Sequence, residues 1–210
     1  MSKSKIFVFG ASGHAKVVID IIEKQGRHEI AFLFDDNAAL KGSKAYGYSI
    51  IGGRQELLEA GLKSGIVAIG SNKARSSISS WMTENGFSMI TAIHPSACIA
   101  RGVIIGNNTA IMAGVVINSD CSIGRDVIIN TKASVDHDCT IGNGVHIAPG
   151  ATLCGTVAVG DGSFVCTGAT IIPNLTIGSG VIIGAGATVI GDIQNGATAV
   201  GSPARIIKVG

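Results

Sequence analysis

Residues 122–150 read SIGRDVIINTKASVDHDCTIGNGVHIAPG and carry an aliphatic residue at every sixth position. The period extends in both directions and is occupied only by Ile, Val or Leu, at Ile93, Ile99, Ile105, Ile111, Ile117, Ile123, Ile129, Val135, Ile141, Ile147, Leu153, Val159, Val165, Ile171, Ile177, Ile183 and Val189. Glycine recurs every eighteen residues, at Gly106, Gly124, Gly142, Gly160 and Gly178. Three hexads therefore make one coil, which predicts a triangular parallel β-helix with the aliphatic residues stacked along its axis. We expect the recurring glycines to turn one corner of each coil at positive φ, which a Cβ disfavours.

The composition agrees with many short strands joined by tight turns. Glycine accounts for 30 of 210 residues, apolar residues for 46%, aromatic residues for 4% and charged residues for 14%. A disordered chain would be richer in charge and poorer in apolar residues, and a helical bundle would hold more Leu, Glu and Lys. The net charge of +2 is too small to indicate a nucleic acid or a membrane surface as partner.

The sequence carries no sign of export. It contains no run of eighteen apolar residues, and its start, MSKSKIFVFG, lacks the apolar stretch of a secretory signal. The five cysteines form no CxxC pair. We therefore expect a cytoplasmic protein whose cysteines are small, buried and reduced.

The first ninety residues follow a different pattern, in which strands alternate with helices. Strands are predicted over residues 5–10, 29–36 and 65–70, and helices over residues 14–26 and 72–85. This alternation indicates a parallel sheet with crossover helices. The length suits four strands, half of a doubly wound Rossmann-like domain. We predict an α/β domain over residues 1–90 and a β-helix domain over residues 91–210.

The turn after the first strand, GASGH at residues 10–14, has the features of a phosphate site. It places Gly10 and Gly13 at a helix N-terminus, where free backbone N–H groups suit an anion. Asp35 and Asp36 end the second strand, where a ribose or base would be bound. The third glycine of the dinucleotide fingerprint and the second mononucleotide half are missing, so a sugar nucleotide fits better than a nicotinamide cofactor. A tight turn without a ligand is the alternative.

One hexad of the repeat, VDHDCT at residues 135–140, breaks the pattern with three outward polar residues, Asp136, His137 and Asp138. A histidine beside carboxylates can act as a general base whose protonated form is stabilised. A solvated surface histidine is the alternative. His146 lies nine residues on and faces a different side of the prism. The histidines lack the close pair of a zinc site, so we expect no metal.

The chain resembles the hexapeptide-repeat acyltransferases, in the branch of sialic acid O-acetyltransferases and bacillosamine-pathway-like nucleotide-amino-sugar N-acetyltransferases. The motifs that carry the resemblance are FVFGASGHAKVV (7–18), FLFDDN (32–37), VAIGSNKAR (67–75), IHPSA (93–97), the stretch 130–155 and GSPAR (201–205). They span nearly the whole chain in the family's order. The resemblance implies a left hand for the β-helix and a homotrimer with acetyl-CoA bound in the groove between neighbouring subunits.

The resemblance also implies roles for individual residues. His137 matches the catalytic base, and Asp138 matches the acid that orients it, where some relatives carry Glu. The positions that match acetyl-CoA contacts are His146, Gly155, Thr167 and Ala185, the last of which replaces a glycine of some relatives. The positions that match the nucleotide-sugar site are Ser12, Gly13, His14, Asp35, Asp36 and Gly70, and Asn130 matches a polar position of the active site.

The predicted activity is transfer of an acetyl group from acetyl-CoA to the 4-amino group of a nucleotide-linked 4,6-dideoxy sugar. The amine attacks the thioester directly, His137 takes its proton, and a backbone N–H near Gly155 stabilises the oxyanion. The predicted nucleotide of the substrate is UDP, and dTDP, GDP and CMP are the alternatives. A sialic acid O-acetyltransferase and a non-catalytic trimeric sugar-nucleotide-binding scaffold are the competing functions, and the VDHDCT hexad disfavours the scaffold.

Overall fold

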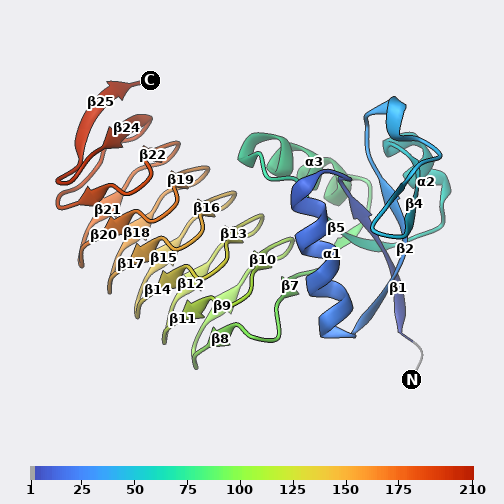
Figure 1. Ribbon diagram of the computed structural model, residues 1–210, viewed down its shortest axis with the longest axis horizontal. Coiled ribbons are helices and arrows are strands. Elements are labelled where there is room, and N and C mark those ends of the chain that lie inside the picture. The colour runs from blue at the N-terminus through green and yellow to red at the C-terminus, as the bar shows by residue number, and fades with distance from the viewer. Residues whose placement is uncertain (1–2) are drawn as a thin grey trace. The chain divides into compact units, whose positions relative to one another are not determined.

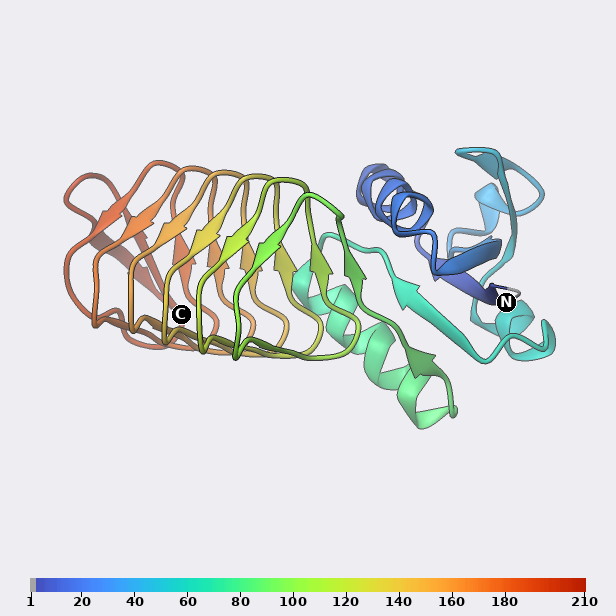
Figure 2. The ribbon, with the colours of Figure 1, turned by 90° about the horizontal axis from the view of Figure 1, so that it is seen from below.

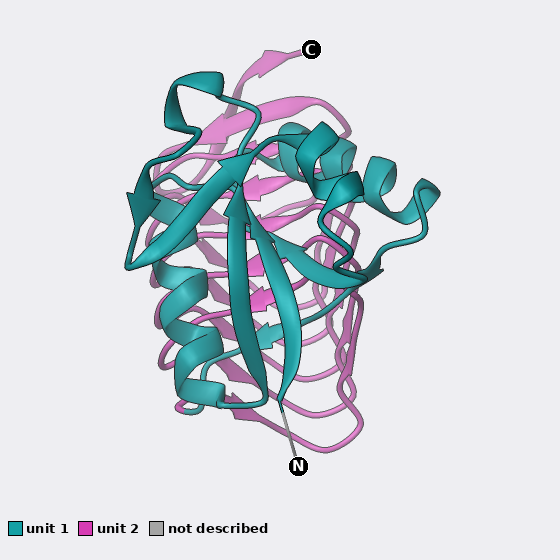
Figure 3. Ribbon diagram, turned by 90° about the vertical axis from the view of Figure 1, so that its right-hand side faces the viewer, with its two compact units in different colours: residues 1–95 teal, residues 96–210 magenta. Residues whose placement is uncertain are grey.

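The chain forms two compact units in the computed structural model, which describes residues 3–210. The first unit ends at Pro95 and the second covers Ser96–Gly210 (Figure 3). Within the described residues, none of the helices is long and apolar enough to cross a membrane.

The first unit is an α/β domain built on one sheet (Figure 1). Its elements are β1 (Ser4–Phe9), α1 (Gly13–Gln25), β2 (His28–Phe34), a 3-10 turn (Ala38–Leu40), β3 (Lys44–Ala45), β4 (Tyr48–Gly52), α2 (Arg54–Glu59), β5 (Ser64–Val67), α3 (Asn72–Glu84), β6 (Ser88–Met89) and β7 (Ala92–Ile93). The strand order in the sheet is β3-β4-β2-β1-β5-β6. The strands from β4 to β6 in this order pair in parallel, which confirms the predicted parallel sheet with crossover helices, and the short edge strand β3 pairs antiparallel with β4.

The predicted number of four strands is wrong, because the sheet of the first unit has six. The two extra strands, β3 and β6, each contain only two residues, too few to show a period of two. The helix α2 was missed for the same reason, since its six residues make fewer than two turns. The predicted end of α1 is confirmed: Gly26 has φ 66° and donates its N–H to Ile22 O.

Apolar side chains from both faces of β1 hold the first unit together. Ile6, Phe7, Val8 and Phe9 are at most 1% exposed, which agrees with a central strand between β2 and β5. The hydrophobic core contains Phe7, Phe9, Phe34, Leu57, Val67 and Met82. This packing fixes the ends of β1, β2 and β5, from which the loops of a candidate ligand site emerge.

The second unit is a left-handed parallel β-helix of two-residue strands. These strands are β8 (Cys98–Ile99), β9 (Ile104–Ile105), β10 (Ala110–Ile111), β11 (Val116–Ile117), β12 (Ser122–Ile123), β13 (Ile128–Ile129), β14 (Ser134–Val135), β15 (Thr140–Ile141), β16 (His146–Ile147), β17 (Thr152–Leu153), β18 (Ala158–Val159), β19 (Phe164–Val165), β20 (Thr170–Ile171), β21 (Thr176–Ile177), β22 (Ile182–Ile183) and β23 (Thr188–Val189). The strands β24 (Ala197–Val200) and β25 (Arg205–Val209) follow and pair antiparallel.

Each strand of the repeat pairs in parallel with the strand three further along, so one coil has three sides, as predicted. Figure 2 shows the strands aligned in columns along the β-helix. We name the three sides by one strand each. The β16 face contains β10, β13, β16, β19 and β22, the β14 face contains β8, β11, β14, β17, β20 and β23, and the β15 face contains β9, β12, β15, β18 and β21.

The period of six aliphatic residues fills the axis of the β-helix, as predicted. Each periodic residue is the second residue of its strand, and from Ile111 to Val189 none of them is more than 2% exposed. Successive coils place these residues in register, so that Ile129 pairs with Ile111 on one side and Ile147 on the other. The β-helix core is therefore a stack of aliphatic side chains.

The predicted role of the recurring glycines is wrong, because positive φ falls at a different place in the hexad. It falls three residues after each aliphatic position from Ile99 to Ile183, with φ from 57° to 82°, at Gly102, Asn108, Gly114, Asp120, Asp126, Lys132, Asp138, Gly144, Gly150, Thr156, Gly162, Gly168, Asn174, Gly180 and Gly186. Gly124 instead lies so near the next coil that a Cβ would come within 2.9 Å of Gly142 C. Close approach of coils, rather than a left-handed turn, explains the eighteen-residue glycine period.

The expectation of five buried cysteines holds only in part. Cys121 and Cys139 are buried, Cys154 and Cys166 are half-buried, and Cys98 is exposed. Cys98 is the first residue of β8, a position whose side chain points away from the axis. Cys121 and Cys139 stand two residues before an axial aliphatic residue and point inward.

Candidate functional site

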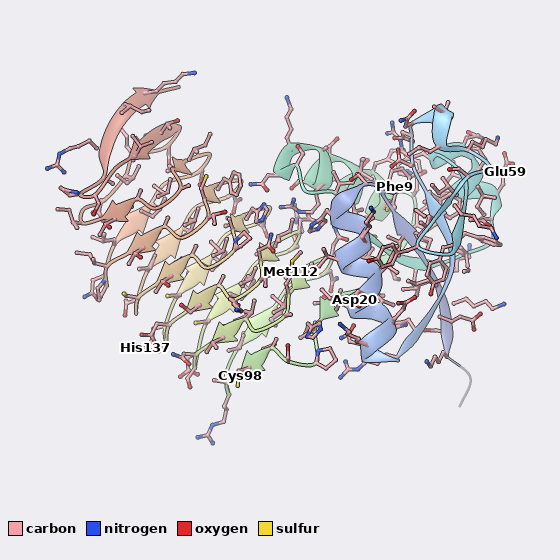
Figure 4. The ribbon with its side chains drawn as sticks, viewed as in Figure 1. Phe9, Asp20, Glu59, Cys98, Met112 and His137 are labelled. Atoms are coloured by element: carbon pink, nitrogen blue, oxygen red, sulfur yellow. The ribbon has the colours of Figure 1, made fainter. Side chains whose placement is uncertain are left out.

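His137 lies on the corner between β14 and β15, and its imidazole is held by a carboxylate. Its Nδ1 lies 2.7 Å from Oδ2 of Asp138, and the two side chains are 58% exposed. Figure 4 shows His137 at the outer edge of a coil. Because Asp138 accepts the Nδ1 proton, Nε2 keeps its lone pair, which is the arrangement of a histidine general base.

A second carboxylate, Asp136, stands at the end of β14. Its Oδ1 accepts a hydrogen bond from Asn118 Nδ2 at 2.7 Å and another from the backbone N of His137 at 2.8 Å. These two bonds, that from Asn118 first, lower the pKa of Asp136. The hydrogen bond to Asp138 and then the charge of Asp136 raise the pKa of His137 above 6.5.

Gly155, one coil later, forms the surface on which the imidazole rests. It is buried, and a Cβ at this residue would lie 2.6 Å from Cε1 and 2.7 Å from Nε2 of His137. Within residues 3–210 the Gly155 amide donates to no acceptor. The structure therefore groups three of the predicted site residues, His137, Asp138 and Gly155, at one corner.

His146 and Asn130 form a second group on the β16 face. Asn130 Nδ2 lies 3.1 Å from His146 Nε2, and because an amide nitrogen only donates, the imidazole nitrogen accepts. The His146 ring stacks on Phe164 with its centroid 4.7 Å away and an interplanar angle of 19°. These contacts fix the imidazole in one orientation over a flat aromatic surface.

Thr167 and Ala185 occupy the same corner of successive coils, after β19 and β22. The Gly186 N–H donates to Thr167 O at 2.9 Å, which holds the two coils together there. Within one chain this corner and the β16 face lie on a different side of the coil from His137. The residues that match the catalytic and acetyl-CoA positions therefore fall into two separate groups.

The GASGH turn of the first unit opens α1 as predicted. Gly10 has φ 113°, and a Cβ there would lie 2.7 Å from Ala68 O, so the turn requires glycine. Ser12 is the N-cap residue of α1, but its side chain makes no capping hydrogen bond. The first N–H groups of α1, beginning at Gly13, lie at the helix end that suits an anion.

The two aspartates after β2 make different contacts. Asp35 accepts the N–H of Ala11 at Oδ2 and that of Asn37 at Oδ1, both at 2.9 Å, and so ties the GASGH turn to the end of β2. Asp36 Oδ2 lies 2.9 Å from Arg54 Nε. Both aspartates line a hollow of about 340 Å³ together with Lys41 and Arg54. Sequence reasoning missed these two basic residues, because α2 and the preceding turn gave no periodic signal.

His14 and Gly70 are neighbours at the ends of α1 and β5. A Cβ on Gly70 would lie 3.9 Å from His14 Cβ. Arg75 is 1% exposed and donates to the carbonyl oxygens of Ile69 and Gly70, both at 3.1 Å. Burial, and then the Arg75 charge, lower the pKa of His14 to about 4. His14 is thus neutral at pH 7, and the loop after β5 rests on a buried arginine that the sequence did not single out.

No group of three or more His, Cys, Asp or Glu side chains within residues 3–210 is arranged to hold a metal ion. At the His137 corner, the hydrogen bond from Nδ1 to Asp138 and the nearby Asp136 carboxylate give the chemistry of a proton acceptor polarised by carboxylates. The visible feature at the end of the sheet is a helix N-terminus beside an aspartate-lined hollow. Together these features suit acyl transfer and the binding of a phosphorylated ligand.

Two known protein families match parts of this chain. Residues 5–82 match the family described as PglD N-terminal domain. Residues 120–155 match the bacterial transferase hexapeptide (six repeats). The second match contains the VDHDCT hexad and its neighbours, and the first contains the GASGH turn and both aspartates.

Solved structures resemble the chain along its whole length. PerB from Caulobacter crescentus, in complex with CoA and GDP-perosamine, is 39% identical over 99% of both chains, with a TM-score of 0.92. The acetyltransferase domain of PglB from Neisseria gonorrhoeae, in complex with acetyl coenzyme A, is 35% identical over 98% of this chain and 100% of that domain, with a TM-score of 0.89.

Among curated proteins, UDP-N-acetylbacillosamine N-acetyltransferase of Bacillus subtilis is 37% identical over 112 residues, which is 51% of each chain. The chain spans about half the length, or less, of the curated relatives that it matches.

Proposed function

This chain belongs to the hexapeptide-repeat acyltransferases, in the branch of the nucleotide-amino-sugar N-acetyltransferases, and from that premise we propose that it transfers the acetyl group of acetyl-CoA to an amino group of a nucleotide-linked sugar. The observation that carries the proposal is the His137 imidazole, bonded to Asp138 through Nδ1 with Nε2 left to accept a proton. The likeness to PerB over 99% of both chains supports the two ligand classes.

The proposed substrate is a 4-amino-4,6-dideoxy sugar linked to a nucleoside diphosphate. The names of the relatives support this class, because one structure holds GDP-perosamine and one curated enzyme is named for a UDP-linked sugar. UDP is the nucleotide to test first, and GDP is its main competitor. We assign nucleotide-sugar binding to the N-terminal unit, at Ser12, Gly13, His14, Asp35, Asp36 and Gly70.

In the proposed reaction the sugar amine attacks the thioester carbonyl of acetyl-CoA. The C–N bond forms as the carbonyl electrons move to oxygen, and His137 Nε2 takes one proton from the amine. Asp138 stabilises the imidazolium, and the Gly155 N–H, which has no acceptor within residues 3–210, supports the oxyanion. Collapse of this intermediate breaks the C–S bond, and the proton leaves with sulfur, which gives the N-acetyl sugar and free CoA.

We further propose that the complete site lies between two subunits of a homotrimer. The support is that one chain separates the His137 corner from the β16 face, which carries His146 and Asn130. A groove between neighbouring prisms can bring the corner of one to the face of the other. In this arrangement acetyl-CoA contacts His146, Gly155, Thr167 and Ala185.

The test is release of free CoA from acetyl-CoA in the presence of UDP-, GDP-, dTDP- and CMP-linked sugars. Each nucleotide is supplied with a 4-amino sugar and with the matching 4-hydroxy sugar, and sialic acid is included as an O-acetyl acceptor. The proposal expects turnover only with amino sugars, an N-acetyl product by NMR, and its loss in His137→Ala. Turnover only with sialic acid, or none with any amino sugar while acetyl-CoA binds, would overturn it.

A further inference from the structure

We propose that Asp136, held by Asn118 of the preceding coil, is a positioning residue for His137 that both fixes the backbone carrying the imidazole and places a second negative charge beside it. The inference rests on the proposed function, in which His137 accepts the proton of the sugar amine. It adds to that function a carboxylate which contacts neither reacting group and acts through His137.

One carboxylate oxygen of Asp136 accepts two hydrogen bonds. Asp136 Oδ1 accepts from Asn118 Nδ2 at 2.7 Å and from His137 N at 2.8 Å. Backbone bonds hold Asn118 and Asp136 in place, because Asn118 N donates to Val135 O and Asp136 N donates to Leu153 O, each at 2.9 Å. Through its carboxylate and its backbone N–H, the half-buried Asp136 thus links three successive coils at the point where the chain turns toward His137.

Few other charges face the imidazole. On its own turn the ionisable neighbours are Asp136 and Asp138, and the charge of Asp136 contributes to the raised pKa of His137 after the hydrogen bond to Asp138. The preceding coil presents Ser119 and Asp120 at this corner, and Asp138 N donates to Ser119 O at 3.0 Å.

The following coil presents Gly155 and Thr156 at the same corner, neither of which carries a charge. Below the corner, the Cys121 thiol donates to Asp136 O at 2.9 Å, and the Cys139 thiol points into the core. Burial raises the pKa of both thiols, so they stay neutral where histidine titrates. Besides its direct partner Asp138, the charge that raises the pKa of His137 is that of Asp136.

The consequence for catalysis has a definite sign. A carboxylate beside the imidazole favours the protonated form, which is the form created when the amine proton is taken. Removing only the charge of Asp136 lowers the pKa of His137 and weakens it as a base. The acidic limb of kcat/KM then moves to lower pH, and its plateau falls by less than the ~10²-fold minimum expected for losing the base.

The experiment compares Asp136→Asn with Asp161→Asn. The first change keeps an oxygen that can accept from Asn118 and His137 but removes the charge. Asp161 is an exposed carboxylate at another corner, whose Oδ1 accepts from Asn143 N at 2.7 Å, so it is a matched control. The first readout is the NMR titration of the His137 Cε1–H, identified by its loss in His137→Ala, and the second is the pH profile of kcat/KM.

The proposal expects the His137 titration to move to lower pH in Asp136→Asn and to stay unchanged in Asp161→Asn. Asn118→Ala removes one of the two hydrogen bonds to Asp136 but leaves the Asp136 charge. This variant should move the His137 titration in the same direction by a smaller amount, and it tests the effect of Asp136 on His137 if Asp136→Asn does not fold. An unchanged titration in Asp136→Asn, or an equal shift in Asp161→Asn, would overturn the proposal. Because the titration needs no substrate, a wild-type protein that acetylates no amino sugar contradicts only the proposed function.

Discussion

Replacing Gly155 with Ala should lower kcat about a hundredfold by displacing the His137 imidazole. The new Cβ would lie 2.6 Å from Cε1 and 2.7 Å from Nε2 of His137. Non-bonded carbon atoms rest about 3.5–4.0 Å apart, so the ring must move by roughly 1 Å. The Nδ1 to Asp138 Oδ2 distance is now 2.7 Å, and such a movement takes it beyond hydrogen-bond range. A 1 Å misplacement of a reacting group costs on the order of 10²-fold in rate.

The same substitution should leave the fold intact. The backbone at Gly155 is outside the left-handed region, so Ala adopts it without strain. The His137 side chain is 58% exposed and can swing into solvent rather than press on the core. A Gly-to-Ala change of this kind gains about 0.4–1 kcal/mol from the unfolded state, so the melting temperature should be unchanged or slightly higher.

The assay is kcat at saturating acetyl-CoA and amino sugar, together with calorimetric affinity for acetyl-CoA and the melting temperature. Gly191→Ala is the control, because residue 191 has the same place in its hexad two coils later and a Cβ there meets nothing within 4 Å. We expect full activity for this control. More than half of the wild-type kcat in Gly155→Ala, or an equal loss in Gly191→Ala, would refute the reasoning.

Four further outcomes follow from the geometry. His137→Ala should lower kcat by about 10²–10⁴-fold and leave the acetyl-CoA affinity, measured by calorimetry, nearly unchanged. In the wild type, kcat/KM should rise with pH through a pKa above 6.5, because the two carboxylates raise the pKa of His137. Asp36→Ala should weaken nucleotide-sugar binding but not acetyl-CoA binding; equal losses would contradict the assignment of the N-terminal unit. His14 has a folded pKa of about 4, below its unfolded value of 6.5, so stability should fall as pH drops from 6.5 to 4, and His14→Gln should flatten that fall in thermal unfolding. Light scattering should give about three times 21.2 kDa, and a fully active monomer would contradict the shared site.

The β-helix was predictable from sequence because its core repeats the same six-residue pattern along the whole axis. Every sixth residue must point to the axis, and each axial residue pairs with the axial residue of the next coil, as Ile129 does with Ile147. What this pattern does not determine is the reason for each turn residue. Gly124 looked like a left-handed turn from its period, but its cause is the approach of the next coil, a contact eighteen residues away that no local pattern reveals.

The site was predictable in its residue types but not in its connections. The hexad with His137 between two aspartates stood out because it broke a repeat of small polar residues. The two aspartates make different contacts, which depend on backbone and side-chain conformation. Asp138, at φ 58°, accepts a hydrogen bond from the His137 ring nitrogen. Asp136 accepts hydrogen bonds from the His137 backbone and from Asn118. The amino-acid sequence alone does not show which of the two aspartates, the one before the histidine or the one after it, contacts the imidazole.

The same distinction applies to the aspartates of the first unit, and it changes how a loss of binding there should be interpreted. Asp35 uses both carboxylate oxygens on the backbone of Ala11 and Asn37, so it shapes the turn that would hold a phosphate. Asp36 faces the side chain of Arg54 across the hollow, so a ligand in the hollow meets an ion pair rather than a free acid. Asp36 Oδ1 also accepts the backbone N–H of Arg54 at 3.1 Å, so Asp36 holds the start of α2 as well as facing the hollow. Asp36, like Asp136, therefore combines a backbone contact with a charge near the site. An Asn variant removes the charge but keeps an acceptor, whereas an Ala variant removes both, which is why Asn and Ala variants at each position must be compared separately.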